Sequence, residues 1–174
     1  MSHWFRVQSI GTILRPDNPG GVAGAFFDPS QRCIVEIDER WQDGLLGIED
    51  YSHLVVLFFL DRATRRRSAG KPGGAQGNDA LPPVGFFATR TPKRPNPIGI
   101  SCPRLIDRDG RRLTVEGLDA WHGTPVLDIK GYSPRDELRA DWHVPEWLEF
   151  LWAEHDQTRP DTLRLWESAA TSSD

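Results

Sequence analysis

Short strand-like segments separated by turn signals constrain the fold of this chain more than any other feature. Residues 53–60 form a continuous apolar run, which is typical of a strand buried on both faces. Other segments rich in β-branched, aromatic or apolar residues lie at 4–14, 32–37, 84–89, 99–107, 111–117 and 125–132. The pair Asp109-Gly110, between two of these, predicts a β-hairpin. Because no long helical segment separates the strands, the sequence predicts an antiparallel barrel or sandwich rather than a doubly wound sheet.

Two segments depart from this strand pattern. Residues 63–83 hold almost no large apolar side chain and are rich in Gly, Arg, Pro and Ser, which predicts a long loop. The apolar residues that fall at helical spacing after Pro145 are Trp147, Leu148, Leu151 and Trp152. They predict an amphipathic helix whose tryptophans serve packing. The expected organisation is a β domain at 1–134, a helical extension at 135–168 and a disordered tail at 169–174.

Composition narrows the class of protein. With 174 residues and 38% apolar content, the chain can bury one core. Cys33 and Cys102 lie far apart and follow no metal-ligand spacing, so we expect cytosolic thiols. The longest apolar run, 54–60, is too short to cross a bilayer, and a cytoplasmic protein without a membrane segment is expected. The histidines show no ligand spacing, so no metal site is predicted. The sequence also lacks the glycine motifs of dinucleotide folds and NTPases.

Charge is unevenly spread along the chain, whose net charge is −4. From Arg62 to Arg94 eight Lys or Arg accompany one acidic residue, a local balance of +7. From Ser133 onward ten acidic residues accompany four arginines, a balance of −6. The basic residues that follow Arg62 in the predicted loop are Arg65, Arg66, Arg67 and Lys71. This stretch is either a solvated face or a surface that contacts phosphates.

The segment 85–99, GFFATRTPKRPNPIG, is a candidate ligand-binding loop. Its three prolines, Pro92, Pro95 and Pro97, restrict the backbone before any ligand arrives. The polar side chains that they accompany are Arg90, Lys93, Arg94 and Asn96. Such a segment can bind a carboxylate, a phosphate or a base edge at low entropic cost. The alternative is a Pro-rich turn with incidental charges.

A second cluster covers residues 117–132. If 125–132 is a strand, the two-residue period places Asp128, Lys130 and Tyr132 on one face, and Leu127 and Ile129 on the other. An exposed Asp–Lys pair of little energetic value is the alternative to a functional role. The turn at 121–125 combines an indole ring, His122 and a tight Gly-Thr-Pro corner.

Four strings, in this order and spacing, resemble the TrmO family, also called the TsaA-like or YaeB-like domain. They are IGTILRP, GIEDYSHLVVLFF, GFFATRTPKRPNPIGIS and GTPVLDIKGYSP, and together they cover about residues 10–134. The resemblance implies a small antiparallel β-barrel that binds S-adenosylmethionine and works as a homodimer. It also implies methylation of N6 of N6-threonylcarbamoyladenosine at position 37 of a tRNA.

Position by position, the resemblance implies a set of cofactor contacts. They fall at Asp61, Arg62, Arg90, Ile100, Asp119, Ala120, Trp121 and His122. Arginines can hold the methionyl carboxylate, and an aromatic ring can stack on adenine or face the sulfonium.

The chain departs from the family pattern in three places. Residues 24–29, GAFFDP, stand where family members usually show a Pro-Arg-Gln segment. His122 stands where they show an Asp immediately before Gly-Thr-Pro. Many members also carry a further C-terminal domain, which 174 residues do not accommodate.

We expect an in-line methyl transfer in which the protein mainly positions the reactants. The poorly nucleophilic N6 needs a base, for which Asp128 and His122 are candidates and Tyr132 a third. The residues expected to contact substrate or RNA are Arg65, Arg66, Arg67, Lys71, Lys93, Arg94, Asn96 and Lys130. Two alternatives stay open: methylation of a small molecule, and a non-catalytic module that binds S-adenosylmethionine or RNA.

Overall fold

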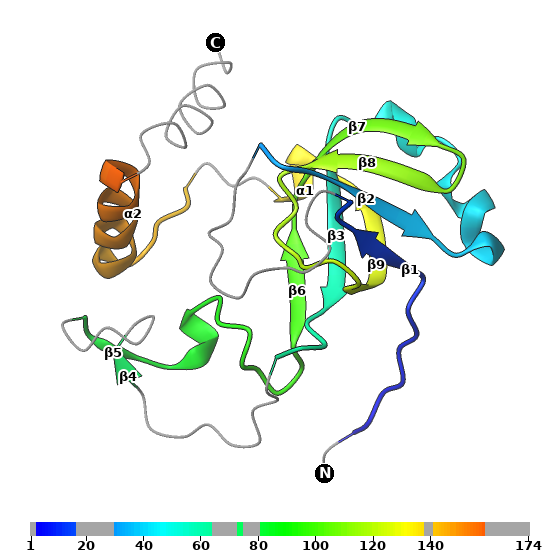
Figure 1. Cartoon of the computed structure of the whole chain (residues 1–174). Helices are drawn as coiled ribbons and strands as arrows, with labels where there is room; N and C mark the ends of the chain where they lie inside the picture. Colours follow the sequence, from blue (N-terminus) through cyan, green and yellow to red (C-terminus); the bar gives the residue numbers. More distant parts are fainter. Residues whose placement is uncertain (1–2, 17–29, 64–72, 75–80, 138–140, 159–174) are drawn as a thin grey trace. The chain divides into compact units, whose positions relative to one another are not determined.

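The computed structural model of the chain describes residues 3–16, 30–63, 73–74, 81–137 and 141–158 (Figure 1). These residues belong to two compact units. The first comprises Met1–Ser68 and Thr91–Leu138, and the second comprises Ala69–Arg90 and Arg139–Asp174. The predicted basic cluster at Arg65, Arg66, Arg67 and Lys71, the GAFFDP segment and the predicted tail lie outside the described residues.

The first unit is built on one seven-stranded antiparallel sheet. Its strands are β1 (Gly11–Leu14), β2 (Arg32–Ile37), β3 (Leu54–Phe59), β6 (Ile98–Ser101), β7 (Arg104–Asp109), β8 (Arg112–Glu116) and β9 (Pro125–Gly131). They lie in the order β6-β3-β9-β1-β2-β8-β7, so strands far apart in sequence are neighbours in space. The mainly β, antiparallel architecture predicted from the sequence is confirmed.

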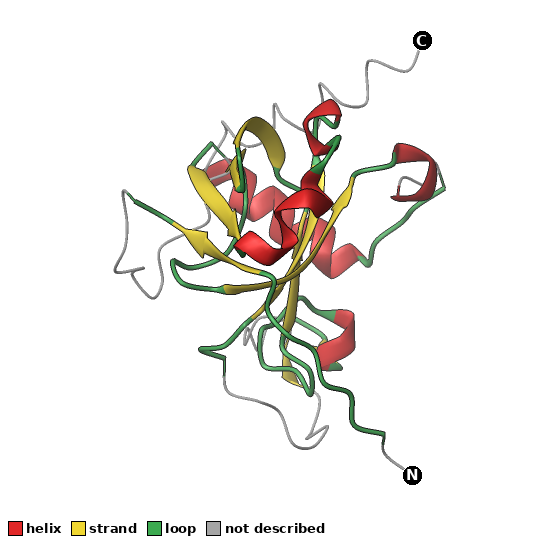
Figure 2. Cartoon of the chain, turned by 90° about the vertical axis from the view of Figure 1, so that its right-hand side faces the viewer, coloured by secondary structure: helices red, strands yellow, loops and turns green. Residues whose placement is uncertain are grey.

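The sheet is strongly twisted and stays open, with β6 and β7 as its edges, instead of closing as a full barrel (Figure 2). The residue before β3 meets the edge strand β7 at one place, where His53 bridges Arg104. Two backbone hydrogen bonds support this bridge, from Leu54 N to Pro103 O at 3.0 Å and from Leu105 N to Ser52 O at 2.9 Å. Pro103 has no N–H to donate, which limits pairing where β6 passes into β7.

The core lies on one face of this sheet. Its fully buried side chains are Ile13, Cys33, Val35, Ile37, Leu54, Val56, Leu113, Val115, Leu118 and Val126. In β2 the buried residues alternate with half-buried ones, as the period of a strand requires. Each such aliphatic side chain contributes about 1.5–3 kcal/mol relative to an exposed one.

Strand β3 is less symmetrically buried than its sequence predicts. Val56 and Phe58 lie in the core, whereas Leu57 and Phe59, on the opposite face, are half-buried. Gly99 of β6 lies against the ring of Phe58, where a Cβ atom would collide with it. The continuous apolar run therefore supplies one fully buried face and one partly open face.

A β-bulge corrects the predicted alternation in β9. The register between β3 and β9 shifts between Leu57 and Phe58, which pair with Asp128 and Val126 and leave Leu127 as the extra residue. Val126 is fully buried and Ile129 packs against the core. Leu127 and Ile129 therefore do not act as the simple alternating pair that the sequence predicts.

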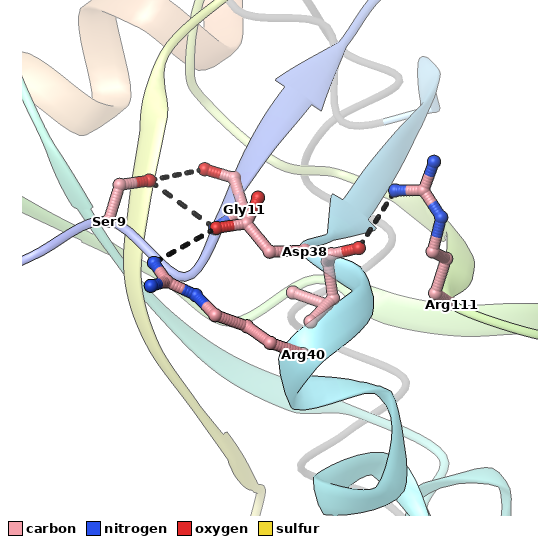
Figure 3. Close-up of polar contacts among 6 residues, drawn as sticks. Ser9, Gly11, Asp38, Arg40 and Arg111 are labelled. Atoms are coloured by element: carbon pink, nitrogen blue, oxygen red, sulfur yellow. Dashed lines mark hydrogen bonds and ion pairs between the residues drawn. The ribbon is translucent and has the colours of Figure 1, made fainter.

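The segment predicted as one strand at 99–107 is two strands, β6 and β7, separated at Pro103, and the remaining predicted strands have the same or shorter bounds. The 4–14 segment is a strand only at β1, because β2 ends at Ile37, opposite Gly11, and offers no partner beyond it. Polar contacts close this end of the ladder (Figure 3): Ser9 Oγ donates to Gly11 O at 2.7 Å, and Arg111 Nη1 donates to Ile37 O at 2.9 Å. The hairpin predicted at Asp109-Gly110 joins β7 to β8, with Gly110 at φ 59°.

Short helical turns complete the first unit. They are η1 (Glu39–Leu45), η2 (Ile48–Asp50) and α1 (Pro134–Glu137). Cys33 is buried and Cys102 is exposed. Burial raises the pKa of the Cys33 thiol to about 11.

The second unit contains β4 (Gly73–Gly74), β5 (Pro83–Val84), η4 (Phe86–Ala88) and α2 (Glu146–Thr158). Helix α2 confirms the predicted helix, and it begins directly after Pro145, whose carbonyl accepts from Leu148 N at 2.9 Å. The strand predicted at 84–89 is wrong beyond Val84, because Ala88 N bonds to Gly85 O at 2.9 Å and closes a turn. No helix within the described ranges is long and apolar enough to span a membrane.

Candidate functional site

Three strand ends meet at the candidate site, all within the first unit. Strands β3 and β9 run antiparallel with Phe58 opposite Val126, so the residues that follow β3 lie beside those that precede β9. Strand β1 pairs with β9 on its other side, with Thr12 opposite Pro125. The sequence-distant positions 15, 61–62 and 118–124 are therefore brought together.

Arg62 and Trp121 form a stacked pair at this place. The guanidinium carbon of Arg62 lies 5.2 Å from the centroid of the indole ring, which is 42% exposed. Arg62 Nη2 also donates a hydrogen bond to His122 O at 3.0 Å. One arginine thus orients both the ring and the main chain of the turn, and much of the indole stays accessible.

The turn at 121–124 depends on Gly123. This residue has φ 82°, a left-handed conformation that other residues adopt only with strain. Gly123 N donates to Ile13 O at 2.8 Å, and Ile13 N donates to Thr124 O at 2.9 Å. The Gly-Thr-Pro corner thereby ties the start of β9 to β1.

Arg15 is a site residue that the sequence analysis did not single out. It is 9% exposed, and its side chain donates to the carbonyl of Ala120 at 2.5 Å, to the carbonyl of Leu118 and to Gln31 Oε1 at 2.5 Å. Its backbone N–H donates to Nδ1 of His122 at 3.0 Å. The sequence signal is a charged residue at the end of an apolar strand, because its partners in the loop, Leu118, Ala120 and His122, lie more than a hundred positions away.

Ile100, Leu57 and Asp128 form a row across three strands. Leu57 pairs with Ile100 of β6 on one side and with Asp128 of β9 on the other, so the three residues share the outer face of the sheet. Ser101, next to Ile100, accepts from Asp119 N and donates to Gly117 O, both at 3.4 Å. The row is therefore linked to the loop that holds Trp121.

Asp128 and Lys130 form an exposed ion pair on this face. The Lys130 ammonium lies 2.7 Å from Asp128 Oδ2. The hydrogen bond to Asp128 and its negative charge raise the pKa of Lys130. Both side chains are accessible to solvent, which limits what the pair contributes to stability.

Tyr132 lies at the far end of β9 from His122. Its backbone N–H donates to His53 O at 3.0 Å, and its ring makes an edge contact with His53 at 6.2 Å between centroids. The strand between Pro125 and Gly131 spans roughly 20 Å at the usual rise per residue. The structure therefore does not bring Tyr132 together with His122.

The proline-rich segment is divided between the two units after Arg90, which belongs to the second unit. Its remainder is anchored to the site strand, since Leu60 N donates to Pro97 O at 2.8 Å. Local bonds from Arg94 N to Pro92 O at 2.9 Å and from Ile98 N to Asn96 O at 2.8 Å order the backbone. Lys93 is exposed on this segment.

The predicted acidic cofactor contacts differ in how they are held. The Asp61 side chain is exposed directly after β3, and its N–H donates to Phe59 O at 2.9 Å. Asp119 is also exposed, whereas Ala120 is buried beneath the loop.

Within the described part of the chain, no three His, Cys, Asp or Glu residues gather as metal ligands.

Known proteins share this domain. The family model for the tRNA-methyltransferase O N-terminal domain matches residues 17–137. A probable S-adenosyl-L-methionine-binding protein of Archaeoglobus fulgidus is 50% identical over 137 residues, which are 74% of this chain and 34% of that protein. The human tRNA (adenine(37)-N6)-methyltransferase is 33% identical over 133 residues, 76% of this chain and 29% of the human protein.

A solved structure agrees with these relatives. The crystal structure of TrmO from Pseudomonas aeruginosa matches with a TM-score of 0.60 and 30% identity, covering 84% of this chain and 63% of that one. The chain thus spans about a third of the length of the two curated relatives. The match over residues 17–137 includes Arg62, Trp121 and His122, and it confirms the family that the sequence strings resemble. The chain belongs to the tRNA-methyltransferase O N-terminal domain family.

Proposed function

We propose that this chain is an S-adenosylmethionine-dependent methyltransferase that acts on N6 of N6-threonylcarbamoyladenosine at position 37 of tRNA. Family membership and the name of the human relative support the reaction class. The observation that carries the proposal is the accessible indole of Trp121, stacked on Arg62 beside a loop held from three strands.

The residues present fit the cofactor. An exposed indole offers a stacking face for adenine, and the exposed carboxylates of Asp61 and Asp119 can accept hydrogen bonds from hydroxyl or amino groups. Ile100 and Leu57 add apolar surface on the linked sheet face. When bound, S-adenosylmethionine supplies an electrophilic methyl group. We assign Arg62, Trp121, Asp119, Ala120 and His122 to the wall that would hold it.

Asp128 is the proposed base for the N6 proton. Its carboxylate is accessible, shares a sheet face with Ile100, and is held in place by Lys130 at 2.7 Å. Adjacent strands lie about 4.8 Å apart, so the backbones of Ile100 and Asp128 are roughly 10 Å from each other. Tyr132, at the other end of β9, stays a weaker prediction.

The proposed RNA contacts among the described residues are polar side chains on the anchored segment and on β9. Lys93 and Lys130 are the exposed lysines of this set, and Arg94 and Asn96 accompany them on the anchored segment. Phosphate contacts of this kind predict binding that weakens steeply with salt. We also propose a homodimer, which light scattering at several protein concentrations would test.

The decisive experiment is incubation with methyl-labelled S-adenosylmethionine and tRNA from cells that lack the modification, followed by nucleoside analysis. Label in methylated N6-threonylcarbamoyladenosine is expected. Asp128→Asn should reduce turnover by about 10²–10⁴-fold and leave cofactor affinity nearly unchanged. Cofactor binding without label in any nucleoside would contradict the tRNA proposal. Salt-independent methylation of a small molecule would support the alternative that the substrate is a small molecule.

A further inference from the structure

His122 is held by an unusual acceptor arrangement. Its Nδ1 accepts a hydrogen bond from the backbone N–H of Arg15 at 3.0 Å, and its own carbonyl accepts from Arg62 Nη2 at 3.0 Å. We infer that His122 is a positioning residue of the cofactor loop, held by Arg15 through Nδ1, and that it is not the base. The part of this inference that concerns cofactor affinity rests on the proposed function.

The tautomer follows from the donor. A backbone N–H can only donate, so the ring nitrogen that faces it must carry a lone pair. The neutral imidazole of His122 therefore keeps its proton on Nε2. To take a proton at Nε2, the ring would have to place its hydrogen on Nδ1, directly opposite the N–H of Arg15. The hydrogen bond that orients the ring thus works against a role as base.

Arg15 holds the same loop with its side chain. Its guanidinium donates to the carbonyls of Leu118 and Ala120, so one nearly buried residue contacts three alternate positions of the loop. The backbone N–H of Arg15 fixes the His122 side chain. The guanidinium of Arg15 fixes the backbone of Leu118 and Ala120. Trp121 lies between Ala120 and His122, so the contacts of Arg15 with these two residues determine the position of the exposed indole.

This arrangement also indicates which side chains could replace His122. The acceptor atoms Nδ1 of His, Oδ1 of Asp and Oδ1 of Asn stand the same number of bonds from Cα. Each can therefore accept from the N–H of Arg15. A glutamine acceptor stands one bond further out and mimics Nε2 instead. Position 122 therefore requires an acceptor atom at the distance of Nδ1 from Cα. A base that acts through Nε2 would not supply an acceptor there.

Four substitutions separate the two roles. His122→Asn and His122→Asp should retain at least about threefold more cofactor affinity and turnover than His122→Ala and His122→Gln, because they keep an acceptor at the reach of Nδ1. His122→Ala and His122→Gln should lose about tenfold in affinity, the loss expected for one hydrogen bond. Titration calorimetry with S-adenosylmethionine and the labelled tRNA assay measure both quantities. If His122→Asn abolishes turnover and leaves affinity intact, His122 is the base and the inference is overturned.

A second measurement does not depend on the proposed reaction. Long-range ¹⁵N–¹H spectra of the full chain should show His122 with an unprotonated Nδ1 and a protonated Nε2, its signals identified by their loss in His122→Asn. Arg15→Ala keeps the backbone N–H, so the tautomer should persist while the melting temperature falls. A proton on Nδ1 would overturn the inference. Failure of the parent chain to bind S-adenosylmethionine would overturn only the proposed function.

Discussion

The first unit contains two arginine–tryptophan stacks that are nearly identical in local geometry. Arg62 lies 5.2 Å from the ring of Trp121, and Arg40 lies 5.4 Å from the ring of Trp41. The two indoles are 42% and 41% exposed. Chemistry and accessibility alone therefore do not distinguish a binding residue from a surface pair.

The surroundings of the two stacks differ. Arg40 and Trp41 are neighbours in η1, and Arg40 otherwise reaches Asp38 at 3.5 Å, two positions away. Arg62 joins the end of β3 to a turn sixty positions later, where it also donates to the main chain of His122. The second arrangement fixes a loop in space, and the first orders only its own helix. The pair at η1 is thus a natural control for the pair at the site.

The largest difference is expected when the indoles are removed. Trp121→Ala should weaken S-adenosylmethionine binding by about 5- to 150-fold, because base–aromatic stacking is worth about 1–3 kcal/mol. Trp41→Ala should change the affinity by less than about twofold. Titration calorimetry on both variants measures the effect. Equal losses, or none in either variant, would remove Trp121 from the cofactor wall.

A smaller difference is expected at the glycines beside the two tryptophans. Gly123 has φ 82°, so Gly123→Ala should cost about 1–2 kcal/mol and lower the melting temperature by roughly 2–8 °C. A Cβ at Gly44 would have no heavy atom within 4 Å, so Gly44→Ala should leave the melting temperature unchanged or slightly raised. An unchanged melting curve for Gly123→Ala would contradict a turn that depends on left-handed backbone.

The smallest difference concerns the arginines themselves. Arg62→Ala should weaken cofactor binding by about 2- to 5-fold, since the exposed cation–π contact that orients the indole contributes about 0.5–1 kcal/mol. Arg40→Ala should leave the affinity unchanged. Arg62→Lys sharpens the test, because lysine keeps the charge but loses the planar stack. Full affinity in Arg62→Ala would show that Trp121 stands without its partner.

Local sequence patterns predicted most of the strands, because each pattern reflects burial within one segment. Residues 32–37 carry a two-residue period that β2 follows closely, and residues 125–131 were recognisable as a strand although a bulge interrupts their alternation. The bulge at Leu57 and Phe58 was not predictable, since it depends on how two distant strands pair. The order of the strands in the sheet could not be predicted either. Strands β3, β9 and β1 are neighbours in the sheet, but no sequence pattern identifies them as partners.

The candidate site shows the same limit. Arg62, Trp121 and His122 lie in strings that resemble a family, so their positions could be named before their contacts were known. Arg15 lies in one of those strings too, yet its part depends on partners 103, 105 and 107 positions away. The position of Tyr132 relative to His122 could not be read from the sequence either, because it depends on the length and direction of β9.

The contacts of Arg15 also determine the order in which parts of the sheet can form while the chain is being synthesised. Arg15 leaves the ribosome long before Ala120, 105 residues later, is made. At a translation rate of about 5–20 residues per second, roughly 5–20 seconds pass between the synthesis of Arg15 and the synthesis of Ala120. Until then β1 can pair only with β2, and its other edge stays open to a neighbouring nascent chain. Proteolysis of stalled chains should therefore find residues 10–15 protected only after residue 131 has emerged.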